Sequence, residues 1–518
     1  MHIHISSISQ DDILQALKNL KPNSCAGLDG IPAFFIKDCS SVLIEPLYIL
    51  FNKCIRTGKF PTIWKETRVC PILKGGDPSA IKNYRPISVL SNFGKLFESI
   101  LYSYIYPLLK NAFNVNQHGF MAGRSTLTNL FSITQYLSQE LDQNKQVDVA
   151  YTDMSKAFDS ITHNRLFLKL RSFGFSESTL ALFQSYLLDR KLRVVFNGYK
   201  SQYYTQFSGV PQGSNLGPLL FLIYIDDIAH IIKHSRFELY ADDLKIYKTI
   251  NTYDDSLLLQ EDIHNIVAWC TLNGLTLNIL KCLIVSFTRK HTQIIFNYVI
   301  NEIIIARSKT VKDLGVIFDD TLSFREHITN VVQTTFKLLG FIIRNAKPFN
   351  NVSLLKSIYC SLVRSKLEYC SLIYFPFYNY QSLALESVQR RFLKFMFYQQ
   401  HREYPILHIE ETKLLEEFKL ESLKQRRISH AIAFLHKVVH GVISSEHILS
   451  YVKFHVPRIN SRYALDFILP KSRTNLMKKS PLYTICHYAN NLPPECDIYA
   501  DSLRNIMVKS RSRFSNYL

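Results

Sequence analysis

The stretch ELYADDLKIY (238–247) places two adjacent acids, Asp242 and Asp243, between two short apolar runs. Apolar residues alternate with polar ones on both sides of the doublet, a pattern that predicts two strands meeting at a tight turn. Asp is common in turns because its side chain accepts hydrogen bonds from nearby backbone N–H groups. Adjacent carboxylates nevertheless repel one another unless a positive charge lies between them. The turn is therefore either an ordinary hairpin tip or one half of a metal site.

A third carboxylate upstream favours the metal site. In QVDVAYTD (146–153), apolar residues alternate at Val147, Val149 and Tyr151, which predicts a strand that ends at Asp153. If this strand neighbours those around Asp242, the acids converge at one edge of a sheet. Three carboxylates can hold two hard divalent cations ~4 Å apart, the arrangement used for in-line phosphoryl transfer.

The composition suggests a polyanionic partner. The chain has 518 residues, enough for more than one domain, and 61 Lys and Arg against 42 Asp and Glu give it a formal charge of +19. The 29 Tyr and 35 Phe suit stacking on unpaired bases, although most belong in a core. A basic protein without a nucleic-acid partner is the alternative interpretation.

The ten cysteines form no C-x-x-C pair, which indicates free thiols in a reducing compartment and no zinc module. The N-terminus lacks the basic start and apolar run of a signal peptide. The most apolar stretch, LGPLLFLIYI (216–225), is too short to span a bilayer. We expect an intracellular protein that does not engage a membrane.

Local patterns predict a mixture of helices and strands. Ser9 and Asp12 form a capping-box-like start for an amphipathic helix. Short extended pieces are expected over 59–90, helices over 94–110 and 125–143, and a hairpin with its turn at Asn197-Gly198. From about residue 320 onward helices dominate, including one run over 414–441.

Several ordered blocks carry a family resemblance. YTDMSKAFDSI (151–161), SGVPQGSNLGPLLFLIYIDDI (208–228) and LYADDLKIY (239–247) resemble the palm motifs of reverse transcriptases. The wider pattern resembles non-LTR (LINE-type) retrotransposons, jockey-like elements in particular, and it extends from about Ile13 past Arg391. The supporting blocks, in the family's order, are KNYRPISVL (82–90), NQHGFMAGRST (116–126), GLTLNILKC (274–282) and KDLGVIFDDTLSFREHI (312–328).

The resemblance implies an α+β, right-hand polymerase fold. Its expected parts are fingers, a palm with an antiparallel sheet, a helical thumb and a mostly helical C-terminal region. The implied boundaries are an N-terminal helical extension leading into the fingers (1–53), the reverse transcriptase domain of fingers and palm (54–319), the thumb (320–400) and a basic C-terminal region (401–518).

The resemblance also implies the catalytic acids. Asp153, Asp242 and Asp243 match them and would bind two Mg²⁺ ions, for which Mn²⁺ is a possible substitute. Asp153 and Asp242 would be the most direct ligands, and Asp243 a looser one. Three competing acids lie off these positions and are expected to be structural: Asp159, Asp226 and Asp227.

Residues expected at the nucleotide follow from the same motifs. Phe158 would exclude a 2′-hydroxyl, and an ordinary packed Phe is the alternative. Gln212 and Gly213 would contact the nascent base pair and template, unless they form only a tight turn. The basic residues expected to bind the triphosphate are Arg68, Lys74 and Arg85. The alternative for each of them is a solvated surface charge. Lys281 would act on the leaving pyrophosphate.

The primer–template backbone would be held by the thumb. The candidates there are Arg364, Lys366, Arg390, Arg391 and Lys394. From Lys453 to the end there are eleven Lys and Arg against four acids, a bias that suits element RNA or target DNA.

The implied function is an RNA-directed DNA polymerase of a mobile element, which copies RNA into DNA from a 3′-hydroxyl primer. Its partners would be an RNA template, a DNA primer or target and dNTPs, with the endonuclease domain supplied by another part of the element and the nucleus as the location. One alternative is a catalytically inactive nucleic-acid-binding remnant. Another is a viral-type RNA polymerase or maturase; Phe158, and YADD where RNA polymerases usually show GDD, argue against the polymerase version.

Overall fold

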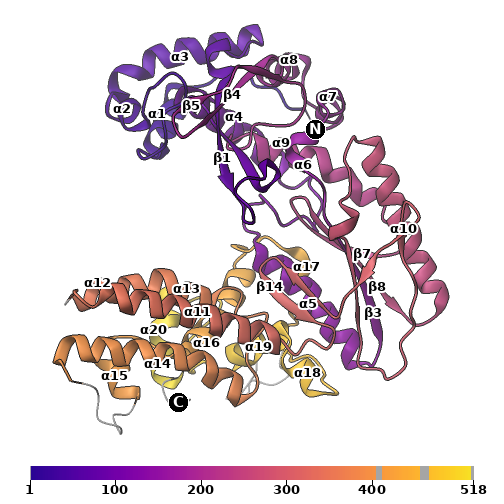
Figure 1. Cartoon of the computed structure of the whole chain (residues 1–518), viewed down its shortest axis with the longest axis vertical. Helices are drawn as coiled ribbons and strands as arrows, with labels where there is room; N and C mark the ends of the chain where they lie inside the picture. Colours follow the sequence, from indigo (N-terminus) through magenta and orange to yellow (C-terminus); the bar gives the residue numbers. More distant parts are fainter. Residues whose placement is uncertain (1, 350, 404–410, 456–465, 515–518) are drawn as a thin grey trace.

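The computed structural model describes residues 2–349, 351–403, 411–455 and 466–514. Figure 1 shows three parts arranged as a C, with the N-terminal elements at the top, a sheet on the right and a helical assembly at the lower left. Helices and two five-stranded sheets occur together, so the predicted α+β class is confirmed.

The N-terminal part is mainly helical and begins at the predicted cap. The Ser9 side chain accepts a hydrogen bond from the Asp12 N–H, and the Asp12 carboxylate accepts one from the Ser9 N–H. The stacked rings of Phe51 and Phe97, with centroids 4.7 Å apart, lie in the core of this part. Its helices are α1 (Gln10–Asn19), α2 (Ala33–Asp38), α3 (Ser40–Thr57), η1 (Thr62–Lys65), η2 (Ile81–Asn83), α4 (Asn92–Leu109), α6 (Ala157–Ser160), α7 (His163–Ser172), α8 (Glu177–Leu187), α9 (Gly217–Ile225) and η3 (Asp226–His230).

The first sheet lies in this part and has the order β2-β1-β4-β5, with β6 paired to β4. The predicted Asn-Gly turn joins β4 to β5, and both turn residues are left-handed, with φ of 48° at Asn197 and 83° at Gly198. The strands are β1 (Glu66–Leu73), β2 (Tyr84–Val89), β4 (Arg190–Phe196), β5 (Tyr199–Lys200) and β6 (Tyr204–Gln206).

The second sheet has the order β12-β9-β3-β8-β7 and β3 at its centre. Val147 and Val149 of β3 lie in one hydrophobic core, and Ala150 lies in another on the opposite face. Asp148, on the same face as Ala150, is also fully buried, because both faces of the sheet are covered. The strands are β3 (Gln146–Thr152), β7 (Arg236–Tyr240), β8 (Asp243–Ile250), β9 (Leu283–Phe287) and β12 (Ala306–Arg307).

Two helices cover opposite faces of this sheet. Phe131 of α5 (Thr126–Asp142) shares the core of Val147, and Ile263 of α10 (Tyr253–Leu272) shares the core of Ala150. The short elements around them are η4 (Ile279–Lys281), the hairpins β10 (Val299–Ile300) with β11 (Ile303–Ile304) and β13 (Thr310–Asp313) with β14 (Val316–Asp319).

Helices dominate after β14, as the sequence predicts. The run expected to be helical over 414–441 is broken, because α15 ends before a new capping box begins at Ser422. The helices are α11 (Arg325–Ala346), α12 (Val352–Tyr359), the π-helical η5 (Cys360–Arg364), α13 (Ser365–Glu368), α14 (Asn379–His401), α15 (Glu411–Glu417), α16 (Leu423–Val439), α17 (Glu446–Tyr451), α18 (Asn475–Lys478), α19 (Pro481–Asn490) and α20 (Leu503–Phe514).

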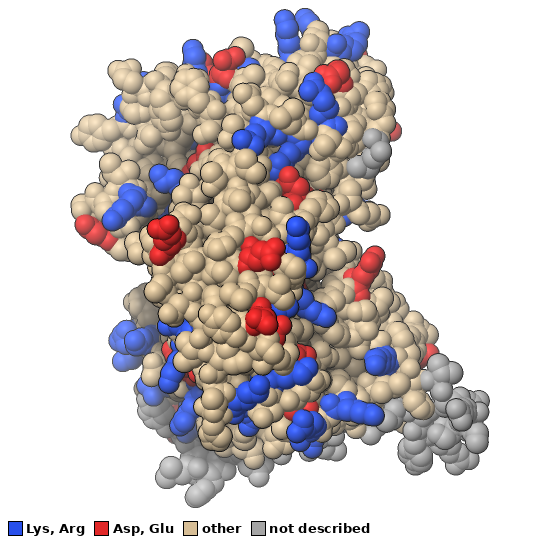
Figure 2. All heavy atoms as spheres, turned by 90° about the vertical axis from the view of Figure 1, so that its right-hand side faces the viewer, with Lys and Arg blue, Asp and Glu red and all other residues tan. Residues whose placement is uncertain are grey.

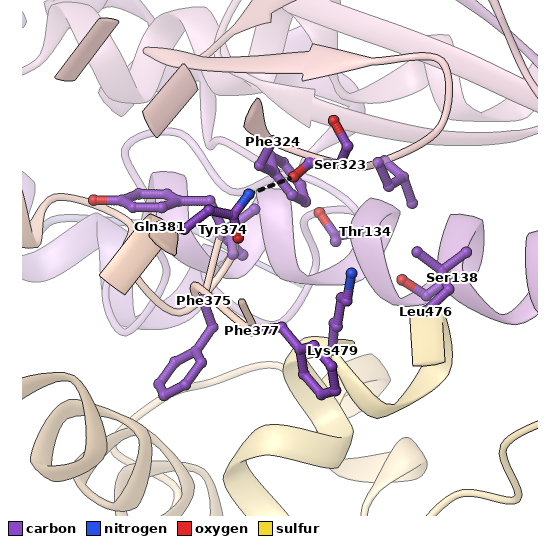
Figure 3. Close-up of a pocket in the computed structure, with 12 residues that line it drawn as sticks. Thr134, Ser138, Ser323, Phe324, Tyr374, Phe375, Phe377, Gln381, Leu476 and Lys479 are labelled. Atoms are coloured by element: carbon purple, nitrogen blue, oxygen red, sulfur yellow. Dashed lines mark hydrogen bonds between the residues drawn. The ribbon is translucent and has the colours of Figure 1, made fainter. Parts of the chain in front are cut away.

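The C-terminal helices pack directly on α5. The rings of Phe131 and Phe434 stack with centroids 5.2 Å apart. Figure 3 shows a small pocket lined by side chains from four places: α5, the start of α11, α18, and the segment that leads into α14. The hydrogen bond drawn in Figure 3 runs from the Gln381 amide to the Ser323 carbonyl. Lys479 reaches from the C-terminal side to within 3.9 Å of the Tyr378 ring centroid. The C-terminal helices therefore share one core with the second sheet.

Positive and negative side chains are interspersed on the face of the molecule that carries α10 (Figure 2). Figure 2 shows the face that carries α10, on which Lys and Arg side chains are spread over the upper and lower parts, with Asp and Glu among them. The excess of positive charge is therefore not gathered into one patch on this face. Of the basic segment 453–518, residues 456–465 and 515–518 lie outside the described residues. Within the described part of the chain, no helix is long and apolar enough to cross a membrane.

We expect Asp142→Ala to destabilise the protein by about 1–3 kcal/mol, because its buried carboxylate accepts three hydrogen bonds from Arg473 and Thr474. The urea midpoint measures the loss, with Asp38→Ala at an exposed position of α2 as the control. Equal midpoints for the two variants would show that Asp142 does not help to hold the C-terminal helices.

Candidate active site

The Asp doublet lies at the tip of the β7–β8 hairpin. Tyr240 pairs with Asp243, so Ala241 and Asp242 alone form the turn, and Ala241 adopts a left-handed φ of 57°. The strand that ends before Asp153 is predicted to lie beside the strands around Asp242, and this is confirmed. Strand β3 pairs antiparallel with β8, and Thr152 lies opposite Leu244. This register brings Asp153, the residue after β3, level with Asp243. The three acids therefore lie at the same end of the neighbouring strands β3 and β8.

A cavity of about 290 Å³ opens beside these acids. It is bounded by the ends of β3 and β8, by Lys281 and by the β13–β14 hairpin. The residues that line it are Asn129, Tyr151, Thr152, Asp153, Tyr240, Asp243, Leu244, Lys245, Lys281, Leu283, Val311, Lys312, Asp313 and Leu314. Asp242 is outside this set, so the doublet presents its two acids to different surroundings.

Both acids of the doublet have raised pKa values. Loss of hydration, reinforced by repulsion from Asp153, raises the pKa of Asp242. The positive charges of Arg85 and Lys74 act against this rise. Loss of hydration and repulsion from Asp242 raise the pKa of Asp243 to about 6.

Lysines balance two other carboxylates. Lys281 Nζ lies 3.2 Å from Asp153 Oδ2, and both side chains remain partly exposed. Lys245 and Asp313 form a close ion pair inside the cavity, at 4% and 7% side-chain exposure. Sequence reasoning missed this pair, although a lysine inside a strand that is apolar on either side signals a buried partner.

Two of the basic residues predicted for the triphosphate approach the acids, and one does not. Lys74 follows β1 and Arg85 lies in β2, so both lie at the end of the β1–β2 hairpin that carries the connecting loop. Arg68 pairs with Val89 at the other end of that hairpin and donates a hydrogen bond to the Ala26 carbonyl.

The Phe158 ring is partly buried and fixed from two sides. It stacks on Phe221 with centroids 4.4 Å apart and meets Phe120 edge to face at 5.8 Å. The ring cannot turn aside without disturbing both neighbours.

The Gln212-Gly213 turn is tied to two other segments. The Gln212 amide donates to Asp159 Oδ1 at 2.7 Å, and its carbonyl accepts from the Ser88 N–H. Gly213 has a φ of 116°, and a Cβ there would lie 2.7 Å from the Ser88 carbonyl oxygen. Glycine is needed at position 213 because β2 approaches the turn so closely that a side chain would not fit.

The remaining acids anchor backbone and side chains. Asp226 accepts a hydrogen bond from the Asn114 N–H at 2.8 Å, and Asp227 accepts one from Lys169 Nζ at 2.8 Å. These partners lie apart from the doublet, in accord with the structural roles expected for both acids.

The basic residues predicted for the primer–template backbone fall into two groups. Arg364 lies 3.7 Å from a Glu368 oxygen and Arg390 lies 2.7 Å from one of Glu411. The other three are exposed, Lys366 on α13 and Arg391 and Lys394 on α14.

The donor set suits hard divalent cations, which prefer carboxylate oxygens. Burial and repulsion between the acids raise the pKa values of Asp242 and Asp243, and a bound cation would favour their ionised forms. In the described ranges, however, no three His, Cys, Asp or Glu side chains are already gathered closely enough to hold a metal ion. The Lys281 ammonium supplies positive charge beside the Asp153 carboxylate.

Comparison with known proteins gives one family. A family model described as "Reverse transcriptase (RNA-dependent DNA polymerase)" matches residues 72–343, more than half of the chain. The chain is 28% identical to the "Probable RNA-directed DNA polymerase from transposon BS" of Drosophila melanogaster, over 63% of this chain and 37% of that protein. It is 27% identical to the "RNA-directed DNA polymerase from mobile element jockey" of Drosophila funebris, over 64% of this chain and 37% of that protein. It thus spans little more than a third of these relatives.

We expect Asp243→Asn to stabilise the metal-free protein, and the gain to grow as the pH rises from about 4 to about 6. The pKa of Asp243 is about 6 in the folded protein against an ordinary 3.8, so the folded state binds this proton more tightly than the unfolded chain. Stability from this group is therefore present below the ordinary value and lost as the pH rises through the folded one.

The measurement is the urea midpoint in EDTA for both proteins across this pH range. Asp254→Asn, at an exposed acid in the first turn of α10, is the matched control. Added Mg²⁺ should shrink the gain, because a bound cation replaces the missing positive charge. A gain that stays constant with pH would show that Asp243 is not crowded by other acids.

Proposed function

Since this chain belongs to the reverse transcriptase (RNA-dependent DNA polymerase) family, we propose that it copies RNA into DNA by extending a primer 3′-hydroxyl. The observation that supports this most strongly is the pairing of β3 with β8, which brings Asp153 level with the Asp242-Asp243 turn beside the Lys74 and Arg85 hairpin. Its partners would be an RNA template, a DNA primer or target and dNTPs. An endonuclease from another part of a mobile element would create the primer in the nucleus.

We assign the parts of the fold to a right-hand polymerase. The first sheet and its helices correspond to fingers, and the second sheet to the palm, together within 54–319. Residues 1–53 lead into the fingers, 320–400 form the thumb, and 401–518 form the basic C-terminal region. The shared core of α5 and the C-terminal helices makes that last region a support of the palm.

Asp153 and Asp242 would hold the divalent cations most directly, with Asp243 as a looser ligand. Mg²⁺, or Mn²⁺ in its place, would supply positive charge that activates the primer hydroxyl and stabilises the transferred phosphate. Arg85 and Lys74, whose positive charges act on Asp242, would bind the oxygens of an incoming triphosphate. Lys281, an exposed ammonium beside Asp153, would give a proton to the leaving pyrophosphate. Arg68 is proposed to support the hairpin instead.

Specificity for deoxyribonucleotides would come from Phe158. A ring held between Phe221 and Phe120 presents a rigid surface, which would clash with a 2′-hydroxyl. Asp159 would orient the Gln212 amide toward the nascent base pair, so this acid acts through its neighbour. Gly213 would keep the turn close to β2 and leave room for the template.

Exposed basic side chains of the thumb would hold the primer–template backbone. Lys366, Arg391 and Lys394 project from the helices and suit phosphate contacts. Arg364 and Arg390 would have to exchange a carboxylate partner for a phosphate, so we expect them to contribute less.

Asp153→Asn and Asp242→Asn are each expected to lower primer extension at least ~10²–10³-fold, because a lost ligand removes charge stabilisation from the transition state. The assay is extension of oligo(dT) on poly(rA) with dTTP and Mg²⁺, beside an unfolding curve for each variant. Asp254→Asn should retain wild-type activity. Wild-type rates in either test variant would refute the assignment of the acids, and an inactive wild type would favour a nucleic-acid-binding remnant.

Phe158→Val is expected to raise the ratio of ribonucleotide to deoxyribonucleotide incorporation, because the smaller side chain leaves room for a 2′-hydroxyl. Phe120→Val is the control, since it disturbs the same ring cluster from an exposed position. An unchanged ratio in an active Phe158→Val enzyme would mean that this ring only fills the core. The same rise in both variants would point to general loosening of the cluster.

A further inference from the structure

The turn that carries the Asp doublet has a backbone conformation that needs support. Ala241 is left-handed, with a φ of 57°, a conformation that is unfavourable for a residue other than glycine. This residue directly precedes Asp242, so its conformation sets the direction in which the Asp242 carboxylate leaves the turn. An interaction that holds Ala241 would therefore position that acid.

Gln117 supplies such an interaction with a single side chain. Its Oε1 accepts hydrogen bonds from the Ala241 N–H at 3.0 Å and from the Gly119 N–H at 2.8 Å. Its Nε2 donates to the Ala241 carbonyl at 3.5 Å. The side chain is only 2% exposed, so water does not compete for these bonds.

The segment around Gln117 lies against β7 as a short parallel extension. The Leu239 N–H donates to the Asn116 carbonyl at 2.9 Å, and the His118 N–H donates to the Leu239 carbonyl at 2.8 Å. These bonds fix the segment two residues before Ala241. The Gln117 amide therefore approaches the turn from a rigid support.

Gly119 allows this close approach. A Cβ at Gly119 would lie 2.2 Å from the Ala241 nitrogen and 2.9 Å from the Tyr240 carbonyl carbon. Since both contacts are with backbone atoms, any side chain at position 119 must displace the turn itself.

Arg124 holds the segment from behind. Its guanidinium donates to three carbonyl groups within it, including that of Gln117 at 2.7 Å. Its Nε donates to the Ser444 carbonyl at 2.8 Å, and the Ser444 N–H donates back to the Gly123 carbonyl at 3.1 Å. The segment thus connects the loop before α17 with the Asp doublet.

We propose that Gln117 is a positioning residue for the reaction, which fixes the Asp242 carboxylate by holding both backbone polar groups of Ala241, and that Arg124 and Ser444 brace it from the C-terminal region. The catalytic consequence rests on the proposed polymerase function. Without Gln117 the turn relaxes, and Asp242 loses its alignment with Asp153. The nucleotide contacts from the β1–β2 hairpin remain.

The first test measures the turn itself, without catalysis. We expect Gln117→Leu and Gly119→Ala to speed hydrogen exchange of the 238–246 backbone in the metal-free protein. Gln135→Leu is the matched control, because it also removes a buried amide, one that accepts from the Leu482 N–H on α19. Arg124→Lys should speed exchange in both 114–120 and 238–246. Unchanged exchange at 238–246 in Gln117→Leu would overturn the proposal, whether or not the protein is a polymerase.

The second test separates positioning from loss of structure. Gln117→Leu is expected to lower kcat for primer extension about 10- to 100-fold and to raise the Mg²⁺ concentration needed for half-maximal rate, with the KM for dTTP nearly unchanged. Adding Ala241→Gly should recover part of kcat, because glycine adopts the left-handed conformation without support. No recovery, or a loss in kcat equal to that of Gln135→Leu, would reduce Gln117 to a packing role. An inactive wild type with faster exchange in Gln117→Leu would reject the polymerase function and keep the turn support.

Discussion

The pairing of β3 with β8 is the interaction on which the other features depend. Its seven residue pairs extend from Gln146 opposite Ile250 to Thr152 opposite Leu244. Because side chains alternate across a sheet, a shift by one residue would exchange the sets that face the two cores. Val147 and Val149 would then leave the core of the C-terminal helices, and buried Asp148 would enter it. Burial on both faces thus fixes the register, and the register brings Asp153 level with Asp243.

The edge reached by this register is electrostatically costly for the metal-free protein. Asp242 and Asp243 have raised pKa values because they are poorly hydrated and close to other acids. Positive charge reaches the site from separate elements, with Lys74 and Arg85 on the β1–β2 hairpin and Lys281 at the end of η4. Local strain and charge crowding of this kind persist only where the surrounding structure enforces them. The two buried cores hold the strands that carry these acids in place.

The C-terminal helices belong to the same physical unit as the sheet. Phe434 of α16 stacks on Phe131 of α5, and Asp142 at the end of α5 caps the backbone of residues 473 and 474. Arg124 adds a polar route from Ser444 to the segment beside the Asp doublet. Substitutions in this region can therefore displace the strands that carry the Asp doublet, because a packed core transmits displacement.

The sequence by itself determined many local elements and the family. The capping box at Ser9, the Asn197-Gly198 turn and the strands around Asp242 follow from short-range patterns, and the ordered motifs indicated the family before any coordinates. Tertiary structure decided what local patterns cannot encode. It bound the Arg68 guanidinium to the Ala26 carbonyl, engaged Arg364 and Arg390 with glutamates, buried Lys245 against Asp313 and set Gln117 on the Ala241 backbone. These outcomes join residues tens to more than a hundred positions apart, except for the Arg364–Glu368 pair within one helical run. Hydrophobic periodicity reports which face of an element is buried, but not which charged or amide group lies opposite it once the cores have formed.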